Sequence, residues 1–340
     1  MKFFFHILIS LLPLGHLLSL PEGTEVLQGG ATHSTVGKEM TIRAPDGSIL
    51  RHKRFNLASD ETIRFEQPTT ESRALNRITD SAPSRIDGRI EANGRVYIVN
   101  PAGVVFGSGS TVEAGRLHVI GGRYSDEDFN ARTHRYSDLS GEIRNEGELR
   151  AESISLSGSS VTNLGRIHAP DGFVALSAGS SVELLESDGS LSVSLQTGSQ
   201  NLVTNQSVVG DLAGQALLET GILESREVHL SGSEVDASGS IRATRSRMLI
   251  DSHLRQTGEG ASVETEMLEI ESLSSGTSYQ PTIELSSSAN RLSTLRASGA
   301  YTRFSASSST SLSVENASTS SESSPSSSSL QTDHLDLRSY

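Results

Sequence analysis

Residues 96–107 read Val96-Tyr97-Ile98-Val99-Asn100-Pro101-Ala102-Gly103-Val104-Val105-Phe106-Gly107, two short apolar strands joined by a tight turn. The first strand is rich in β-branched and aromatic residues, which suit a pleated surface. Asn100-Pro101 ends it, because proline fixes its own φ and lacks a backbone donor. Gly103 can adopt a positive φ, which lets the chain enter the second strand at a new angle. Such a corner between apolar strands favours a coiling β-solenoid over a flat sheet.

A spacing repeats along the chain outside this segment. Apolar residues and glycines follow Gly147 and Gly221 at the same offsets of 2, 7, 9, 11, 14 and 18 residues. The units that begin at Gly165 and Gly239 continue the match, and Gly88 opens the same pattern upstream. A period of about 18 to 21 residues corresponds to one β-helix coil. Alternation within each strand predicts this inward-facing set: Ile90, Val96, Ile98, Leu149, Ile154, Leu156, Ile167, Val174, Leu176, Leu223, Val228 and Leu230.

The fold class predicted from this repeat is all-β, with coils that stack about 4.8 Å apart. A two-sheet β-sandwich also has short alternating strands. The shared offsets favour the solenoid, because sandwich strands vary in length and connection. Residues 124–138 interrupt the repeat, and we predict an excursion there with a short helix or a β-hairpin. Residues 22–57 carry polar turns between short strands.

Four pieces of sequence between Phe65 and Gly107 resemble the conserved core of the N-terminal haemagglutination, or two-partner-secretion, domain family, as in filamentous haemagglutinin. The pieces are Phe65-Glu66-Gln67-Pro68, Ser72-Arg73-Ala74-Leu75-Asn76-Arg77-Ile78, Pro83-Ser84-Arg85-Ile86-Asp87-Gly88-Arg89-Ile90 and Asn100-Pro101-Ala102-Gly103-Val104-Val105-Phe106-Gly107. The family's usual Asn-Pro-Asn-Gly has Ala102 in place of the second asparagine. The resemblance implies a right-handed parallel β-helix with an N-terminal cap. It also implies these secretion-motif residues: Asn76, Asn100, Pro101, Gly103, Phe106 and Gly107.

The chain divides into four expected segments. Residues 1–19 read as a secretory signal peptide, with Lys2 before an apolar run and the small Ser19 at its end. That run is too short for a comfortable transmembrane helix, although an anchored N-terminal helix is the alternative. Residues 20–200 are predicted to form the secretion-type β-helix domain, and residues 201–304 its continuing coils. Residues 305–340 form a serine-rich low-complexity tail.

Composition narrows the functional classes. Hydrophobic residues make up 34% of the chain and aromatic residues 4%, with no tryptophan, which suits a narrow stack of valine, isoleucine and leucine. The net charge of -13, without a basic patch, argues against nucleic-acid binding. The absence of cysteine excludes disulfides and thiolate metal sites.

No set of residues with catalytic spacing stands out, and we expect neither an enzyme nor a cofactor. His118, His168 and His229 alternate with apolar residues and are predicted to be outward-facing polar side chains. Asp126-Glu127-Asp128 could offer oxygen ligands to Ca²⁺, but without the spacing of a known calcium loop we predict a solvated acidic segment. A charged edge that discourages aggregation is predicted from Glu142, Glu146, Glu148 and Glu152.

Two functions from different classes remain. The first is a secreted, non-enzymatic protein of the two-partner type, exported across the inner and outer membranes to the medium or cell surface. The resemblance implies an outer-membrane β-barrel transporter as its partner, and a role in adhesion or surface interaction with a receptor or glycan. The alternative is a secreted polysaccharide-active β-helix enzyme, such as a pectin lyase or galacturonase. That class needs clustered acidic residues on neighbouring coils, which the sequence does not show.

Overall fold

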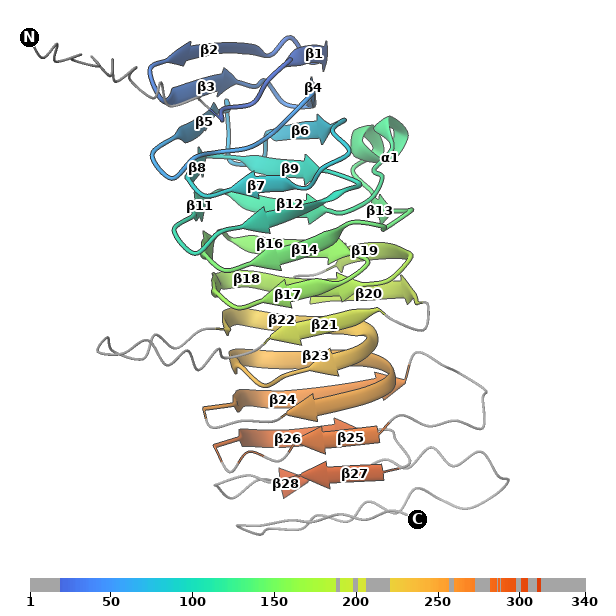
Figure 1. The fold of residues 1–340 in the computed structure, drawn as a ribbon. Helices are drawn as coiled ribbons and strands as arrows, with labels where there is room; N and C mark the ends of the chain where they lie inside the picture. Colours follow the sequence, from blue (N-terminus) through green and yellow to red (C-terminus); the bar gives the residue numbers. More distant parts are fainter. Residues whose placement is uncertain are drawn as a thin grey trace, which may run out of the picture.

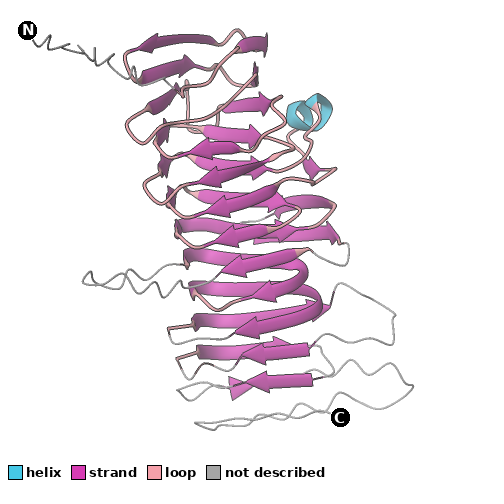
Figure 2. Cartoon of the chain, viewed as in Figure 1, coloured by secondary structure: helices cyan, strands magenta, loops and turns pink. Residues whose placement is uncertain are grey.

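A stack of parallel strands runs almost the whole length of the computed structural model, with one short helix on its side (Figures 1 and 2). The structure describes residues 19–187, 190–197, 201–205, 221–256, 260–272, 282–285, 287, 289–297, 301–304 and 311–312. Residues 1–18 of the predicted signal peptide lie outside this part of the chain. So does the predicted serine-rich tail, except β28 (Ser311–Leu312).

The pairing of the strands defines three stacks, which we name faces A, B and C. Face A contains β4 (Ser48–His52), β6 (Arg73–Ile78), β9 (Arg95–Val99), β12 (Arg116–Ile120) and β16 (Ser153–Gly158). Face B contains β7 (Ser84–Ile86), β10 (Gly103–Phe106), β14 (Glu142–Asn145), β17 (Val161–Asn163), β21 (Leu202–Asn205), β25 (Thr282–Leu285) and β27 (Tyr301–Phe304). Face C contains β3 (Glu39–Arg43), β5 (Thr62–Glu66), β8 (Arg89–Ala92), β11 (Thr111–Glu113) and β15 (Glu148–Arg150).

Further along the chain single strands bend around the corners between faces. β18 (Arg166–Ala178), β24 (Ser262–Ser272) and β26 (Arg291–Ala297) serve faces C and A. β22 (Ile222–Asp236) and β23 (Ser240–Gln256) run through all three faces. Each coil of the solenoid therefore contributes one strand, or one segment of a bent strand, to each face. This confirms the predicted β-helix.

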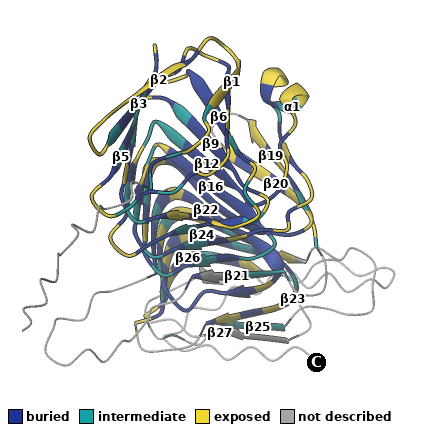
Figure 3. Ribbon diagram, turned by 45° about the horizontal axis from the view of Figure 1, so that its top comes forward, coloured by how far each residue is buried: buried dark blue, intermediate teal, exposed yellow. Residues whose placement is uncertain are grey.

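Residues at equivalent positions of the sequence repeat pair with one another in adjacent coils. Leu149 pairs with Ile167, which pairs with Leu223, although these residues are far apart in sequence. Every residue of the predicted inward-facing set lies in the main core cluster and is at most 1% exposed. Buried aliphatic side chains therefore fill the space between the three faces. Figure 3 shows that buried residues predominate along the stacked strands. Because parallel strands buried on the inside need such residues, the pattern of Leu, Ile and Val sets the coil.

Two antiparallel strands close the N-terminal end of the stack. β1 (Glu25–Gln28) pairs with β4 and so ends face A, and β2 (Thr32–Val36) pairs with β3 and so ends face C. All residues of both strands are exposed. They cover the backbone groups that an open stack would otherwise present to other chains. This is the cap that the family resemblance implied.

A second, smaller sheet lies against the outside of face A. Its antiparallel strands are β13 (His134–Tyr136), β19 (Ser181–Ser187) and β20 (Ser190–Gln196), and we call it the lateral sheet. Beside it, α1 (Asp126–Ala131) begins after Ser125, whose hydroxyl accepts a hydrogen bond from the Asp128 amide. The prediction of an excursion with a short helix is confirmed. The hairpin of β19 and β20 was not anticipated from the sequence.

The lateral sheet creates a second core. Its inward side chains pack on the outward side chains of face A and on α1 in one cluster, which includes Tyr97, Ile120, Phe129, Tyr136 and Val182. Face A is thus buried on both sides over this stretch. Among the described residues, no helix is long and apolar enough to cross a membrane.

Candidate functional site

The corner between β9 and β10 is held by the side chain of Asn100, which is fully buried. Its Oδ1 accepts a hydrogen bond from the Ala102 amide at 2.9 Å, while Nδ2 donates to the Ala82 carbonyl at 3.2 Å and to Ser84 Oγ at 3.1 Å. One amide therefore closes its own turn and ties it to the preceding coil. Pro101, the next residue, is exposed.

Gly103 has a φ of 109°, as the sequence predicted, and lies against the next coil. A β-carbon there would lie 2.4 Å from the Glu142 carbonyl oxygen. Two requirements, a positive φ and a close approach of backbone, therefore select glycine. Phe106, three residues on, is fully buried in the main core, and Gly107 is buried at the next corner. Phe106 therefore fills the core, whereas a β-carbon at Gly107 would lie 2.0 Å from a carboxylate oxygen of Asp87 in the preceding coil.

Asn76 is a polar residue inside the apolar core. It sits on β6, with Oδ1 3.0 Å from Nε2 of the buried His52, and its Nδ2 donates to the Tyr97 carbonyl at 3.2 Å. Burial lowers the pKa of His52 to about 4, so the ring is neutral at pH 7. His52 Nδ1 in turn lies 3.0 Å from Thr24 Oγ1 in the segment before β1. Asn76 therefore connects the first coils to the cap.

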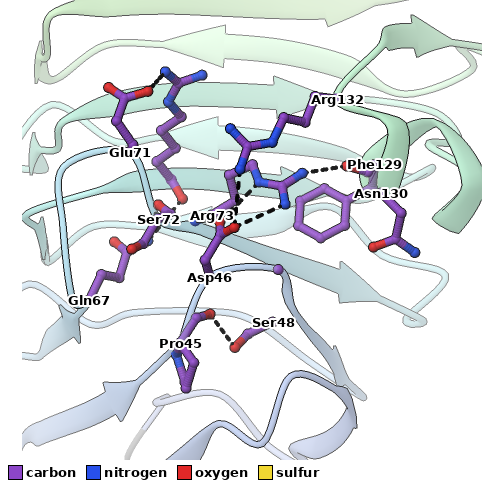
Figure 4. Close-up of polar contacts among 12 residues, drawn as sticks. Pro45, Asp46, Ser48, Gln67, Glu71, Ser72, Arg73, Phe129, Asn130 and Arg132 are labelled. Atoms are coloured by element: carbon purple, nitrogen blue, oxygen red, sulfur yellow. Dashed lines mark hydrogen bonds and ion pairs between the residues drawn. The ribbon is translucent and has the colours of Figure 1, made fainter.

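Arg73, within the second motif piece, joins three separate segments (Figure 4). Its guanidinium donates to both carboxylate oxygens of Asp46, at 3.0 and 3.2 Å, and to the Phe129 carbonyl at 2.6 Å. It also lies 4.9 Å from the centroid of the Phe129 ring. The Arg73 hydrogen bonds lower the pKa of Asp46 and keep it charged. The β3–β4 turn, β6 of the next coil and α1 are thereby fixed to one another, and Asp46 also receives a bond from Arg132 at 3.3 Å.

A cleft of about 840 Å³ opens beside the Asn100–Gly103 corner. Its lining includes Pro101, Leu27 of the cap, Tyr124 and parts of the lateral sheet. Its charged groups are paired: Arg77 bonds Asp126 at 2.5 Å, Arg123 bonds Asp138 at 3.3 Å and Arg135 bonds Glu183 at 2.8 Å. Of the motif residues, Pro101 is the one that reaches this surface.

The prediction that the three histidines face outward gives the right direction, but outward does not mean exposed for two of them. His118 and His229 do point away from the main core, as alternation requires, but they are 1% and 2% exposed. The lateral sheet covers the side of face A on which His118 lies, and Leu191 of that sheet bonds Glu227, the neighbour of His229. His168 is half-buried and lies 3.1 Å from a carboxylate oxygen of Glu224.

The acidic segment forms the first turn of α1, where negative charge is favourable. Asp126 bonds Arg77, and Asp128 bonds the hydroxyls of Ser125 and Thr133. Within the described ranges, no three His, Asp or Glu side chains are arranged to hold a metal ion. The edge predicted from Glu142, Glu146, Glu148 and Glu152 is exposed or half-buried.

The sequence reasoning missed the Arg73 junction. Arg73 belongs to a motif piece that carries no charge pattern of its own, so its partners are not evident from the sequence. A signal was available, because Arg73 lies in a strand among apolar residues, where an unpaired charge would be costly. The structure thus connects Asn76 through His52 to the segment before β1, and joins Arg73 to the β3–β4 turn and α1. It places Asn100 and Gly103 at a corner, Phe106 in the core, and Gly107 beneath the Asp87 side chain at the next corner.

Comparison with known proteins agrees with this geometry. Residues 19–265 match the family model described as the TPS secretion domain. A heme/hemopexin-binding protein of Haemophilus influenzae is 33% identical over 210 residues, which are 57% of this chain and 23% of that protein. A second heme/hemopexin-binding protein of Haemophilus influenzae is 31% identical over 99 residues, 28% of this chain and 11% of that protein. The chain thus matches about a quarter or less of these relatives' length.

Two solved structures share the fold. The HMW1 secretion domain from Haemophilus influenzae superposes with a TM-score of 0.54 at 18% identity, over 87% of this chain and 76% of that one. The filamentous hemagglutinin secretion domain gives a TM-score of 0.50 at 17% identity, over 80% of this chain and 95% of that one. At these identities the likeness is to the fold alone, a long all-β stack of parallel strands.

Proposed function

This chain belongs to the TPS secretion domain family, and from that premise we propose that its folded N-terminal part is the address read by an outer-membrane transporter. The family match over residues 19–265 is the observation that carries this proposal. On this view the protein is exported across both membranes and reaches the medium or the cell surface without being an enzyme. The predicted boundary near residue 200 stays a prediction, and the family match extends beyond it.

The burial of the motif side chains supports separate roles for buried and exposed residues, the first in folding and the second in recognition by the transporter. Asn76, Asn100 and Phe106 are fully buried, and their partners are other parts of this chain. A transporter that meets the folded coils can touch Pro101 and the cleft beside it, but not these side chains. We therefore assign to Asn76, Asn100, Gly103, Phe106 and Gly107 the building of the coil. Recognition is assigned to the exposed surface around Pro101.

The experiment separates folding from secretion. The chain is coexpressed with its cognate transporter, and the secreted fraction is compared with the thermal stability of the purified protein. Asn100→Ala removes three hydrogen bonds, so stability and secretion should fall together. Arg123→Glu changes a side chain that is 76% exposed at the cleft, so secretion should fall at unchanged stability. Lys53→Glu, on the exposed surface and outside the cleft lining, is the matched control. An Asn100→Ala protein of normal stability that is not secreted would contradict this assignment.

For the exported protein we propose adhesion or surface interaction with a receptor or glycan. Binding of haem or of hemopexin is the second candidate, favoured by the 33% identical relative of that name. The shared segment is 23% of that relative, which is the size expected if the two proteins share their secretion part. Titration of the purified chain with haemin and with hemopexin distinguishes the candidates. Saturable binding of either would favour the second one.

The polysaccharide-active alternative has its own test. A pectin lyase or galacturonase should release unsaturated or reducing ends from polygalacturonate. The purified chain is expected to release none, because the acidic residues of faces A and C are mostly paired with arginines, as in Glu224–Arg242 and Glu269–Arg247. Turnover that persists in independently purified samples would overturn the non-enzymatic proposal.

A further inference from the structure

Two histidines lie stacked between face A and the lateral sheet. His118 of β12 and His134 of β13 have ring centroids 4.9 Å apart, with an angle of 12° between the planes. Tyr97 stacks on His118 at 4.5 Å and lies 6.0 Å from His134, so the three rings form one compact cluster. His118 is 1% exposed and His134 is 9% exposed. One ring belongs to the solenoid and the other to the lateral sheet, so the stack is a point of attachment between them.

The hydrogen bonds at this stack suit neutral rings. The Tyr136 hydroxyl lies 3.3 Å from His118 Nδ1 and 3.4 Å from His134 Nδ1. A hydroxyl donates one hydrogen, so it can donate to one ring while it accepts from the other. Within the described part of the chain, His118 Nε2 is buried and has no partner. A proton on that nitrogen would be an unsatisfied buried donor beside a second imidazole.

The surrounding charges compensate only in part for protonation, because Glu186 favours a charged His134 while the neighbouring arginines oppose it. Arg73, Arg95 and Arg116 stack in register on the same side of face A. Their carboxylate partners are Asp46 for Arg73, Glu71 for Arg95, and Glu152 and Glu186 for Arg116. The lateral sheet contributes Glu186 of β19, whose carboxylate forms an ion pair with Arg116 at 2.8 Å.

The acidic groups of α1 and its flanking residues are also paired. Asp126 forms an ion pair with Arg77, and Asp128 contacts Ser125, Thr133 and Arg135. The phenols of Tyr97, Tyr124 and Tyr136 complete the surroundings.

We propose that the lateral sheet is an acid-released flap, which stays closed on face A while His118 and His134 are neutral and lifts when they take up protons. The solenoid beneath remains folded, because the lateral sheet is not part of its strand ladders. Lifting separates the two rings and lets water reach His118 Nε2. It also uncovers the outward side chains of face A around Tyr97 and Ile120, an apolar surface that is buried at neutral pH.

The direction of the pH dependence follows from burial. Desolvation lowers the pKa of both rings in the closed state, and the neighbouring imidazole and arginines lower that of His118 further. The open state therefore binds more protons below about pH 6.5, the ordinary value for histidine. Closure is fully favoured above that pH and weakens as the pH falls. The opening equilibrium rises by up to about tenfold per pH unit for each histidine that takes up a proton.

The test is hydrogen exchange measured by mass spectrometry on the full chain at pH 7.5, 6.0 and 5.0, corrected for intrinsic exchange rates. Amides of β19 and β20 should lose protection as the pH falls, while those of β16, which lies in the solenoid ladder, keep theirs. A His118→Gln/His134→Gln variant should retain β19–β20 protection at pH 5.0. His33→Gln, on the exposed β2, is the matched control and should behave like the unmodified chain.

The measurement on the unmodified chain decides the proposal even if the double variant does not fold. Equal protection of β19 and β20 at pH 7.5 and 5.0 would overturn it. Loss of β16 protection in step with β19 and β20 would also overturn it, because acid would then unfold the whole solenoid. A folded double variant that opens as readily as the unmodified chain would show that other groups control the flap.

Discussion

Two parts of one solenoid hold their coils in register by different means. From β3 to β21, buried amides connect neighbouring coils: the Gln67 side chain donates to the Ser72 carbonyl and accepts from the Gly94 amide, and Asn145, Asn163 and Asn205 form a ladder at 2.8 and 2.9 Å. From β22 onward, exposed charges alternate in sign from coil to coil, as in Glu224, Arg242 and Glu264. Arg247 and Glu269 repeat this arrangement on face A.

Buried amides and exposed ion pairs differ in how they respond to a displaced coil. A buried amide bonds in one direction and at one distance, so a slipped coil leaves it unsatisfied. An exposed ion pair tolerates small displacements and is screened by water and salt. The division is not complete, because Gln256 and Asn290 form a buried amide pair in the later coils, and Arg64 bonds Glu39 and Glu91 of the neighbouring coils in the earlier ones. We expect the earlier coils to be rigidly specified and the later ones to be adjustable, and four predictions test this.

The largest effect is expected at the Asn100–Gly103 corner. Gly103→Val combines a φ of 109° with a β-carbon placed 2.4 Å from the Glu142 carbonyl oxygen. We expect a loss of about 4 kcal/mol in the free energy of unfolding, measured by urea denaturation. Gly37→Val is the matched control, because Gly37 also has a positive φ but has open space around it. Equal losses in the two variants would mean that close coil packing contributes nothing at the corner.

The second-largest effect is expected from acid, which should destabilise the contact between the first coils and the cap. His52 has a pKa of about 4 in the folded protein, against about 6.5 unfolded, because burial disfavours its charged form. The stability that depends on a neutral His52 is fully present above pH 6.5 and is lost as the pH falls to about 4. This lowers the free energy of unfolding by about 3 kcal/mol. His52→Gln does not titrate and can still donate to Asn76 Oδ1, so its stability should fall less between pH 7 and 4. Parallel pH profiles for the two proteins would exclude His52 as the cause.

The solenoid could be predicted from the sequence, but the contacts of the elements that pack on its outside, the lateral sheet and α1, could not. The reason is that the solenoid pattern is local, whereas these contacts join distant segments. The offsets after Gly147 and Gly221 are local, because each coil repeats the same alternation. The burial of His118 depends instead on the lateral sheet, whose strands lie far along the chain. Arg73 likewise finds its partner at Phe129, 56 residues away. Alternation gave the correct direction for His118, but direction alone does not reveal what covers a side chain.

The amide ladder should give an intermediate effect. Asn163→Leu removes the central member and leaves buried groups of Asn145 and Asn205 without their partner. We expect a loss of about 2 kcal/mol, independent of salt concentration. Replacing Asn145, Asn163 and Asn205 together by leucine should cost less than three times the single change, because no side-chain amide of the ladder is then left without its partner and only the Gly147 amide loses its side-chain acceptor. Strict additivity in urea denaturation would count against a coupled ladder.

The charge ladder should give the smallest effect, and the one that separates the two parts most clearly. Arg242 is 62% exposed and bonds Glu224 at 2.9 Å and Glu264 at 3.1 Å. Arg242→Glu places a third carboxylate between two others, and because the site is exposed we expect a loss of at most about 1 kcal/mol. The loss should shrink as salt is added, since screening acts over about 10 Å at 0.1 M. Adding Glu224→Arg and Glu264→Arg restores alternation at these three positions and should recover part of the stability, because Glu264→Arg also lies in register with Arg291. A loss that matches Asn163→Leu, or that does not respond to salt, would show that the later coils are specified as rigidly as the earlier ones.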